Sequence, residues 1–462
     1  MGQLIVVSNR VTQPQVGQAV GGLAVALNDA LKDHGGTWLG WNGAQVSDTH
    51  PLEFQEQQHD QVTYVTTPLN HNEYQNFYSG FANNTLWPML HSRLDLMVED
   101  PTQFQTYQQV NQRFAQKIAE IAQEDDIIWV HDYHFLSLAE QCRQLGLKNR
   151  IGFFLHIPFS DTDHWQQLHV ANTLLTDLLA YDVIGLQTQA DQDECIEVYQ
   201  SLLNTAIKHN TIFYQQRRVL VQAYPIGIDP YAIQQAAQGD NLLLQDYFDP
   251  IPKHNVPWII SAERVDYSKG ILERLDAIES WIKEQQASDC FAVIQVACPC
   301  RMEVETYKHL YNSVNQRIAS INQDLSSLEG QPIYVTNQMI PHHQLMQLYK
   351  KSAVCWVNSL KDGMNLVAKE YIAAQDPNNP GVLILSCHTG AAEHMQQALI
   401  VNPHDIKSLK DALSKALDMP LSERMIRYHA LIKDLELNDI YAWRASFLKD
   451  LRHANTRHLH EV

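Results

Sequence analysis

Short apolar strands alternate with helical stretches along the whole chain, and this alternation runs twice. In the first series, the apolar runs lie at 4–8, 126–130, 151–155 and 182–186. In the second series, they lie at 258–261, 291–296, 332–335, 353–357 and 382–385. Strands that alternate with helices are typical of βαβ units and predict parallel sheets. We therefore expect an α/β protein with two doubly wound, Rossmann-like parallel sheets that face a cleft.

The domain boundary is expected near residue 230, after a strand predicted over 219–228. A length of 462 residues exceeds what one hydrophobic core usually serves. The two series therefore predict an N-terminal domain over 1–230 and a C-terminal domain over 231–440. The remaining segment, 441–462, includes helical sequence with two large aromatic residues, and we expect it to pack back on the N-terminal domain.

Composition excludes several classes of protein. With 33 Lys+Arg against 52 Asp+Glu, the net charge of −19 would repel the phosphates of nucleic acids and anionic lipids. No apolar run reaches the roughly 18 residues of a membrane helix, and the N-terminus lacks the basic start of a signal peptide. The seven cysteines are odd in number and scattered, which indicates reduced thiols in a cytoplasmic protein. Cys298 and Cys300 are the only close pair, so we expect no metal site.

Polar side chains follow the strands of both series at the point where each strand ends. They are Asn9, Arg10, His131, Asp132, His156, Arg264, Arg301 and Asp362. Ligands of doubly wound sheets bind at the carboxyl ends of the strands. One such residue is ordinary loop sequence, but a set on separate strands that includes three arginines predicts a site for an anionic ligand.

A turn before the helix expected over 271–282 combines two cations. Arg264 and Lys269 are five residues apart there and would form a compact anion site at a helix start. The alternative is a surface ion pair with Asp266 or Glu273.

A second helix start lies at 362–370. Its first backbone N–H groups would point at a ligand, and Glu370, about two turns further on, could accept both hydroxyls of a ribose. The alternative is a plain capped helix that leaves Lys369 and Glu370 in solvent.

Other motifs narrow the chemistry. Gly21 and Gly22 precede a helix expected over 23–33 and could admit a phosphate to its N-terminus, or they could form a plain turn. The chain lacks a G-x-x-x-x-G-K-[ST] loop, a complete G-x-G-x-x-G after the first strand and a G-x-S-x-G elbow. These absences count against a P-loop nucleotidase, a plain dehydrogenase and an α/β-hydrolase. Asp161 is expected to cap the helix before Trp165 rather than bind a metal nucleotide.

The motifs, in their order, resemble the trehalose-6-phosphate synthase family, retaining glycosyltransferases of the two-Rossmann GT-B type. The resemblance covers nearly the whole chain. It includes the segments 7–10, 21–23, 40–43, 86–88, 131–134, 150–159, 224–228, 263–270 and 362–370. The most specific are ERVDYSKG at 263–270 and DGMNLVAKE at 362–370.

The resemblance implies transfer of glucose from UDP-glucose to glucose 6-phosphate, which gives α,α-trehalose 6-phosphate and UDP. The residues that match the family's acceptor site are Arg10, Trp41, Tyr78, Trp87, Asp132 and Arg301. Arg10 and Arg301 would hold the phosphate by charge-assisted hydrogen bonds. The aromatic side chains would offer apolar faces and polar edges to the sugar.

The resemblance also assigns a donor site and catalytic residues. The donor contacts match Gly22, His156, Arg264, Lys269, Met339, Ile340, Asp362, Gly363, Met364, Asn365, Leu366 and Glu370. The catalytic set is His156, Asp132, Arg264, Lys269 and Asp362. Arg264 and Lys269 would stabilise the charge that develops on the β-phosphate of UDP. In the family's front-face mechanism the departing phosphate takes the acceptor's proton, so His156 would hold a donor hydroxyl or back the anomeric centre rather than act as a general base.

Several alternatives stay open. Met339 and Ile340 replace a His-Phe pair of some relatives, and Lys361 stands where Arg is usual, so ADP or GDP stays open beside UDP. Another acceptor phosphate, such as glycerol 3-phosphate or an aminocyclitol phosphate, would fit the same fold. A non-catalytic sugar-phosphate sensor should have lost a phosphate-binding residue or His156, and a plain nucleotide scaffold does not explain the acceptor-side arginines.

The remaining expectations concern cofactors, assembly and role. No cofactor is expected, although Mg²⁺ could stimulate the reaction by assisting UDP. Relatives form homo-oligomers, so we expect a dimer or tetramer. Osmotic or desiccation protection is the expected physiological role of a protein that makes trehalose.

Overall fold

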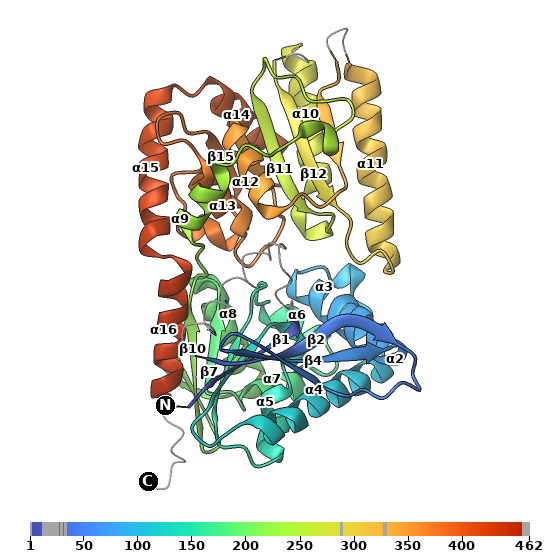
Figure 1. The fold of residues 1–462 in the computed structure, drawn as a ribbon, viewed down its shortest axis with the longest axis vertical. Coiled ribbons are helices and arrows are strands. Elements are labelled where there is room, and N and C mark those ends of the chain that lie inside the picture. The colour runs from blue at the N-terminus through green and yellow to red at the C-terminus, as the bar shows by residue number, and fades with distance from the viewer. Residues whose placement is uncertain are drawn as a thin grey trace. The chain divides into compact units, whose positions relative to one another are not determined.

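The computed structural model describes residues 2–11, 27, 31, 35–286, 290–326 and 330–454 (Figure 1). The chain divides into two compact units. The first unit comprises Met1–Pro225 and Trp443–Val462, and the second comprises Ile226–Ala442. Of the helix expected over 23–33, only Leu27 and Leu31 are described, and both are helical. Gly21 and Gly22 lie outside the described residues.

The first unit contains a ten-stranded sheet in the order β3-β4-β2-β1-β5-β6-β7-β10-β9-β8. Its strands are β1 (Leu4–Arg10), β2 (Gly36–Val46), β3 (Gln55–His59), β4 (Val62–Asn70), β5 (Ile127–His131), β6 (Arg150–Phe154), β7 (Val183–Leu186), β8 (Ala206–Lys208), β9 (Thr211–Tyr214) and β10 (Arg217–Ala223). The seven neighbouring strands β4-β2-β1-β5-β6-β7-β10 run parallel, as expected. The edge strands β3 and β8, and β9 beside β8, pair antiparallel, so this sheet is mixed and not wholly parallel.

Strand β10 is shorter than the sequence predicted. It ends at Ala223, although the apolar run suggested a strand to Ile228. The Tyr224 N–H still donates to the carbonyl of Leu186, at 2.8 Å, but the next residue is Pro225, which has no N–H to continue the ladder. The strand ladder therefore stops before Pro225.

Helices connect the strands of the first unit. They are α2 (His71–Glu73), the π-helix η1 (Tyr74–Leu86), α3 (Trp87–Leu90), η2 (Leu94–Leu96), α4 (Pro101–Ile121), η3 (Tyr133–Phe135), α5 (Leu138–Gln144), α6 (Thr162–Gln167), α7 (Ala171–Leu178) and α8 (Gln189–Leu203). Asp161 caps α6 by accepting from the N–H of His164, at 3.0 Å, which confirms its predicted capping role.

Helix α16 (Ile440–His453) begins in the second unit, and its residues from Trp443 onward belong to the first. Phe447 stacks on Trp129 of β5 with ring centroids 4.9 Å apart. A Cβ at Gly152 or Gly185, on neighbouring strands, would lie 2.8 or 2.7 Å from the Phe447 ring. These two glycines therefore leave the space on the sheet that the helix fills.

The second unit contains a six-stranded parallel sheet in the order β13-β12-β11-β14-β15-β16. Its strands are β11 (Trp258–Arg264), β12 (Ala292–Cys298), β13 (Ile333–Thr336), β14 (Val354–Val357), β15 (Val382–Ser386) and β16 (Leu399–Val401). Its helices are α9 (Pro230–Ala237), η4 (Leu244–Asp246), η5 (Tyr267–Lys269), α10 (Ile271–Gln285), α11 (Glu305–Leu325), α12 (His342–Lys351), α13 (Leu366–Ala374), η6 (Gly390–Glu393), α14 (Ile406–Asp418) and α15 (Leu421–Leu437).

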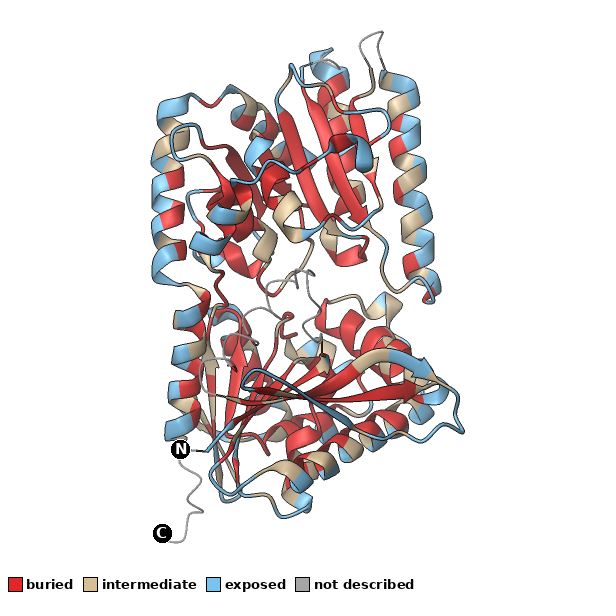
Figure 2. Ribbon diagram, in the orientation of Figure 1, coloured by how far each residue is buried: buried red, intermediate tan, exposed pale blue. Residues whose placement is uncertain are grey.

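A hydrophobic core covers one face of this second sheet. Buried residues of α10, α11 and α14 pack there against β11, β12, β14 and β15. Figure 2 shows the central strands of each unit as largely buried and the outer faces of α11 and α15 as exposed. Burial on this scale is the main stabilising term for a parallel sheet, because both of its faces must be covered. None of the described helices is long and apolar enough to cross a membrane.

Each sheet has a point at which the strand order reverses. In the first sheet the chain runs outward from β1 through β2 and later restarts on the other side at β5. In the second sheet the same reversal lies between β11 and β14. Loops on either side of such a switch point diverge at the carboxyl ends of the strands, and this leaves a place for a ligand.

Candidate functional site

The loops at the first switch point bring together an arginine and aromatic rings. Arg10 ends β1, and its guanidinium lies 5.4 Å from the centroid of the Trp41 ring on β2. Gly43 makes room for it, because a Cβ there would lie 2.4 Å from the Arg10 Nη2. Tyr78 of the π-helix η1 packs on Trp41 with centroids 5.3 Å apart. Three of the predicted acceptor residues are therefore in one cluster.

Trp87 joins this cluster through two intermediate rings. Its indole packs on Tyr133 with centroids 5.6 Å apart, and Tyr133 packs on His134 at 4.1 Å. His134 in turn stacks on Tyr78 at 6.0 Å, with ring planes 11° apart. Tyr133 and His134 were part of a motif but were not predicted as site residues. They connect the predicted aromatic residues into one continuous layer.

Asp132 follows β5 directly and has a strained backbone. Its φ of 75° lies in the left-handed region, where an aspartate is uncommon. This conformation lets its carboxylate Oδ1 accept from the backbone N–H of His156, at 3.3 Å. Two predicted catalytic residues, on the loops after β5 and β6, are therefore joined.

His156 is half-buried beside a second histidine. Its Nε2 lies 3.0 Å from Nδ1 of the buried His131, the last residue of β5. Burial lowers the pKa of His156 to about 3, so its imidazole is neutral near pH 7. A neutral imidazole has one N–H donor and one acceptor, which suits hydrogen bonding to sugar hydroxyls.

The second switch point holds an ion pair. Lys269 ends η5, in the loop after β11, and its Nζ lies 2.6 Å from Oδ2 of Asp362, in the loop after β14. The same carboxylate oxygen accepts from Ser359 Oγ at 3.1 Å and from Asn365 Nδ2 at 3.0 Å. Sequence spacing could not pair these loops, because their adjacency comes from the pairing of β11 with β14.

Three predicted cations and the carboxylate of Asp266 act electrostatically on one thiol in this unit. Burial raises the pKa of Cys300 to about 11, while the charges of Arg264, Arg301 and Lys269 oppose that rise. All three side chains are therefore within electrostatic reach of one point. Such a concentration of positive charge in an acidic chain suits a diphosphate or a sugar phosphate.

Arg301 is held by two residues that the sequence analysis did not assign to the site. Its Nη1 donates to the hydroxyl of Tyr307 at 2.5 Å and lies 3.8 Å from Oδ2 of Asp266. The Tyr307 hydroxyl in turn donates to the same Asp266 oxygen at 3.2 Å. Asp266 was considered only as a surface ion-pair partner for the cations of the Arg264–Lys269 turn, but it is buried.

The segment 362–366 leads into α13 as predicted, with one difference at its cap. Asn365 has a left-handed φ of 81°, and its side chain accepts from the N–H of Ala368 at 3.1 Å. Asn365 therefore caps the helix, and the helix starts at Leu366. Gly363 and Met364 are buried beside this cap.

The two charged residues of α13 differ from the expectation of a solvated helix. Glu370 and Lys369 are both buried. Glu370 lies about one turn after the helix start, not two, and accepts from His342 at 3.2 Å. Lys369 donates to the carbonyl of Ile226 at 2.6 Å, and burial lowers its pKa to about 8. The helix is therefore tied to both α12 and the first residue of the second unit.

Two of the predicted donor contacts, Met339 and Ile340, follow β13. Met339 is 84% exposed, whereas Ile340 is buried. Of the predicted acceptor residues, Arg301 belongs to the second unit and the other five to the first. Gly22 lies outside the described residues.

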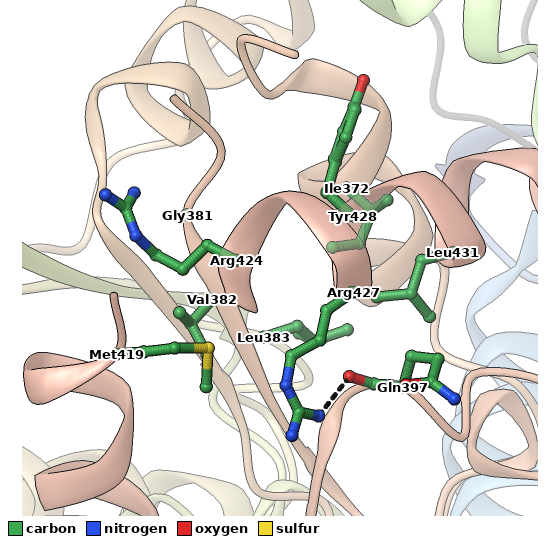
Figure 3. Close-up of a pocket in the computed structure, with 10 residues that line it drawn as sticks. All are labelled: Ile372, Gly381, Val382, Leu383, Gln397, Met419, Arg424, Arg427, Tyr428 and Leu431. Carbon is green, nitrogen blue, oxygen red and sulfur yellow. Dashed lines mark hydrogen bonds between the residues drawn. The ribbon is translucent and has the colours of Figure 1, made fainter. Parts of the chain in front are cut away.

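A pocket elsewhere in the second unit contains none of the predicted residues. It has an empty volume of about 230 Å³, partly open to solvent, and lies between β15, α13 and α15 (Figure 3). Its arginines have protein partners: Arg427 donates to the carbonyl of Gln397 at 2.8 Å, and Arg424 to that of Pro380 at 2.5 Å. The described residues contain no group of three or more His, Cys, Asp or Glu side chains placed to hold a metal ion.

Comparison with known proteins identifies the family. The sequence profile of glycosyltransferase family 20 matches residues 6–453. The chain belongs to glycosyltransferase family 20. The trehalose-6-phosphate synthase of Sodalis glossinidius is 40% identical over 464 residues, which covers 98% of this chain and 96% of that protein. The one from Citrobacter koseri is 38% identical over 480 residues, covering 100% and 98%.

Solved structures of family 20 share the fold. An E. coli structure bound with UDP-2-fluoro glucose has a TM-score of 0.93 at 37% identity and covers 99% of this chain and 100% of that one. A UDP-forming α,α-trehalose-phosphate synthase from Burkholderia xenovorans, in complex with glucose 6-phosphate, has a TM-score of 0.92 at 38% identity, covering 98% and 100%. The expected two-Rossmann GT-B fold is therefore confirmed.

Proposed function

We infer that this chain is a UDP-forming α,α-trehalose-phosphate synthase. It transfers glucose from UDP-glucose to glucose 6-phosphate, with retention at the anomeric carbon. The observation that carries this inference is the full-length match to glycosyltransferase family 20 and to its trehalose-6-phosphate synthases. The cations at the second switch point and the aromatic layer at the first provide the chemistry that such a reaction needs.

Donor activation is proposed for the second unit. As the glycosidic bond breaks, the β-phosphate of UDP gains negative charge. Arg264 and Lys269 would stabilise that charge, and preorganised donors of this kind typically contribute about 10²–10³ in rate. Asp362, which already holds Lys269 at 2.6 Å, would position the lysine and contact the glucose hydroxyls. Asn365, Leu366 and Glu370 would contact the diphosphate and ribose, with Met339 and Ile340 near the base.

Acceptor binding is proposed for the aromatic layer. Trp41, Tyr78 and Trp87 would cover the apolar faces of glucose, and Asp132 would accept from a hydroxyl. Arg10 and Arg301 would bind the phosphate. The departing phosphate would take the acceptor's proton, so no side chain is assigned as a general base.

We propose that the reaction needs no resident cofactor, because Arg264, Lys269 and Arg301 can balance the charge of the diphosphate. Mg²⁺ would act on UDP itself. A homo-oligomer in the cytoplasm and a role in osmotic protection are further proposals. The seven cysteines, which form no disulfide, are consistent with a reducing compartment.

The test is UDP release by purified protein with UDP-, ADP- or GDP-glucose and a panel of acceptor phosphates. We expect turnover with UDP-glucose and glucose 6-phosphate and a product whose NMR spectrum shows an α,α-1,1 linkage. Turnover only with glycerol 3-phosphate would show that the proposed acceptor is wrong, while the proposed donor chemistry would stand. Tight binding of sugar phosphate without turnover would contradict the enzymatic function and support a sensor. Addition of EDTA tests the expectation that no metal is required.

A further inference from the structure

We propose that His131 fixes the tautomer of His156, so that His156 presents its Nδ1–H as a hydrogen-bond donor to a sugar oxygen. His131 is then a positioning residue that touches no substrate. The role in turnover rests on the proposed glucosyltransferase function, whereas the tautomer itself does not.

The geometry of the two rings requires a shared proton. His131 Nδ1 and His156 Nε2 are 3.0 Å apart. The ring centroids are 5.2 Å apart and the planes differ by 24°, so the rings meet edge to edge with their nitrogens aligned. Two lone pairs would repel each other at this distance, and two protons would clash. One of the two nitrogens must therefore carry a proton and donate it to the other.

The surroundings of His131 decide which nitrogen donates. His131 is 1% exposed, and its Nε2 has no hydrogen-bond partner among the described residues. Trp129 and Trp443 pack on this ring at 4.5 and 6.4 Å between centroids, and their buried indole N–H groups also lack a partner there. An indole N–H can only donate. A proton on Nε2 would therefore be a third buried donor without a partner among the described residues, and an unpaired buried N–H is rarer and more costly than an unpaired acceptor.

His131 is thus assigned the Nδ1–H form. Its ring is also neutral, because burial and the neighbouring His156 lower its pKa well below 6.5, so it has no second proton for Nε2. His131 then donates from Nδ1 to Nε2 of His156. The neutral His156 must hold its own proton on Nδ1.

This tautomer limits what His156 can do. Its Nε2 lone pair is occupied by His131, so the ring has no acceptor left to remove a proton from a hydroxyl. Its Nδ1 has no partner among the described residues, and the side chain is half-buried, so the N–H is available to a ligand. The backbone N–H of His156, bound by Asp132 at 3.3 Å, fixes the same residue from its other end. His156 is therefore a fixed donor to a sugar oxygen.

The tautomer can be measured directly in ligand-free protein. Perdeuterated protein labelled with [¹⁵N]histidine distinguishes protonated from unprotonated ring nitrogens by their shifts and two-bond couplings. His156→Gln and His131→Asn assign the two rings by difference. We expect His156 to show protonated Nδ1 and unprotonated Nε2 at pH 7. A protonated Nε2 on His156 would overturn the proposal, whatever reaction the protein catalyses.

Two variants of His131 test the consequence for turnover. We compare His131→Asn with His131→Leu, because an asparagine would place an amide N–H near the position of Nδ1, whereas a leucine has a similar size and no donor. We expect kcat to fall about tenfold or more in His131→Leu and less than about threefold in His131→Asn, with unchanged KM values for both substrates. The exposed His169 serves as the control through His169→Leu, which should leave kcat unchanged.

The two arms separate the possible failures. If the wild-type protein shows no glucosyl transfer but His156 has protonated Nδ1, the proposed function fails and the tautomer assignment stands. If turnover is normal and the two His131 variants lose kcat equally, His131 acts only through packing and its positioning role is refuted.

Discussion

The candidate sites of the two units differ in chemistry. At the switch point of the first sheet the predicted residues are mainly aromatic rings in mutual contact, with one arginine and a neutral histidine pair. At the switch point of the second sheet they are ionic, with Lys269 paired to Asp362 and three cations near Cys300. Aromatic faces suit a sugar ring, and clustered cations suit phosphates. One fold, used twice, therefore carries two kinds of site.

The difference extends to how each site is supported. In the second unit, hydrogen bonds from other polar side chains support the cations. Tyr307 and Asp266 contact Arg301. Ser359 and Asn365 donate to the Asp362 carboxylate, which binds Lys269. In the first unit, ring packing provides most of the support, and Asp132 and His131 add polar contacts to it. Where ion pairs support a site, removal of one partner should cause a large loss of stability or activity, because the other charge stays buried without its partner.

The largest effect is expected for Lys269→Met. This change removes positive charge from the leaving phosphate and leaves Asp362 without its closest cation, so kcat should fall by about 10²–10³. Steady-state kinetics with UDP-glucose and glucose 6-phosphate measures it. Lys283→Met, on the exposed face of α10, is the control and should have wild-type kcat. A loss of less than about fivefold in Lys269→Met would refute the role of this cation in catalysis.

Trp41→Leu probes the aromatic layer. Loss of the ring removes contact area for the sugar and the ring contact that supports Arg10. The KM for glucose 6-phosphate should therefore rise by about tenfold, and kcat should stay within about threefold of the wild-type value. Tyr231→Leu, an exposed aromatic on α9, provides the control. An equal rise in the KM for UDP-glucose would show that the layer does not distinguish acceptor from donor.

A smaller effect is expected for Tyr307→Phe. Arg301 would lose one hydrogen bond but keep Asp266 at 3.8 Å, so the KM for glucose 6-phosphate should rise by about fivefold. Tyr311→Phe, one turn further along α11, removes a comparable hydroxyl away from Arg301 and should change nothing. If the two variants behave alike, Tyr307 does not position Arg301.

The smallest effects concern pH and stability, and they should differ in sign between the units. The folded-state pKa of His131 lies below its unfolded value near 6.5, so the unfolded chain takes up a proton first as the pH falls. Its contribution to the free energy of unfolding is therefore lost progressively below about pH 6.5. Urea unfolding at pH 7.5 and 5.5 should show the gap between wild type and His131→Leu shrink by about 1.4 kcal/mol. An unchanged gap would mean that His131 is protonated in the folded chain.

His342 should behave in the opposite way. Its hydrogen bond and charge interaction with Glu370 raise its pKa above 6.5, so its stabilisation is fully present below the unfolded pKa and is lost as the pH rises through the folded value. His342→Gln should therefore cost more stability at pH 5.5 than at pH 7.5, by about 1 kcal/mol or less. A cost that is larger at pH 7.5 would contradict this ion pair.

Most central strands could be predicted from the sequence, because strands such as β5, β14 and β15 are largely apolar runs between polar loops. The edge strand β3 was missed because its five residues, Gln55–His59, are all polar and exposed, so no hydrophobic pattern marks it. The π-helix η1 was also missed, since it differs from an α-helix in its hydrogen bonds and not in its composition.

The site was predictable as a set of residues but not as a set of contacts. Lys269 and Asp362 are 93 positions apart, and only the strand order places their loops together. Asp132 has a left-handed backbone conformation, which residues other than glycine rarely adopt. This conformation follows from tertiary constraints and not from local propensity. Tyr307 has no distinctive sequence signal, and His131, although it lies in a motif after a strand, has none for its contact with His156, which depends on the tertiary structure.

The most direct test of the division between the two units is a set of four calorimetric titrations. UDP and glucose 6-phosphate are each titrated into Trp41→Leu and Lys269→Met. We predict that Trp41→Leu raises the Kd for glucose 6-phosphate by about tenfold and changes the Kd for UDP by less than about twofold. Lys269→Met should instead raise the Kd for UDP by about tenfold and change the Kd for glucose 6-phosphate by less than about twofold. If either variant raised the Kd for both ligands equally, the aromatic and ionic sites would not bind separate substrates.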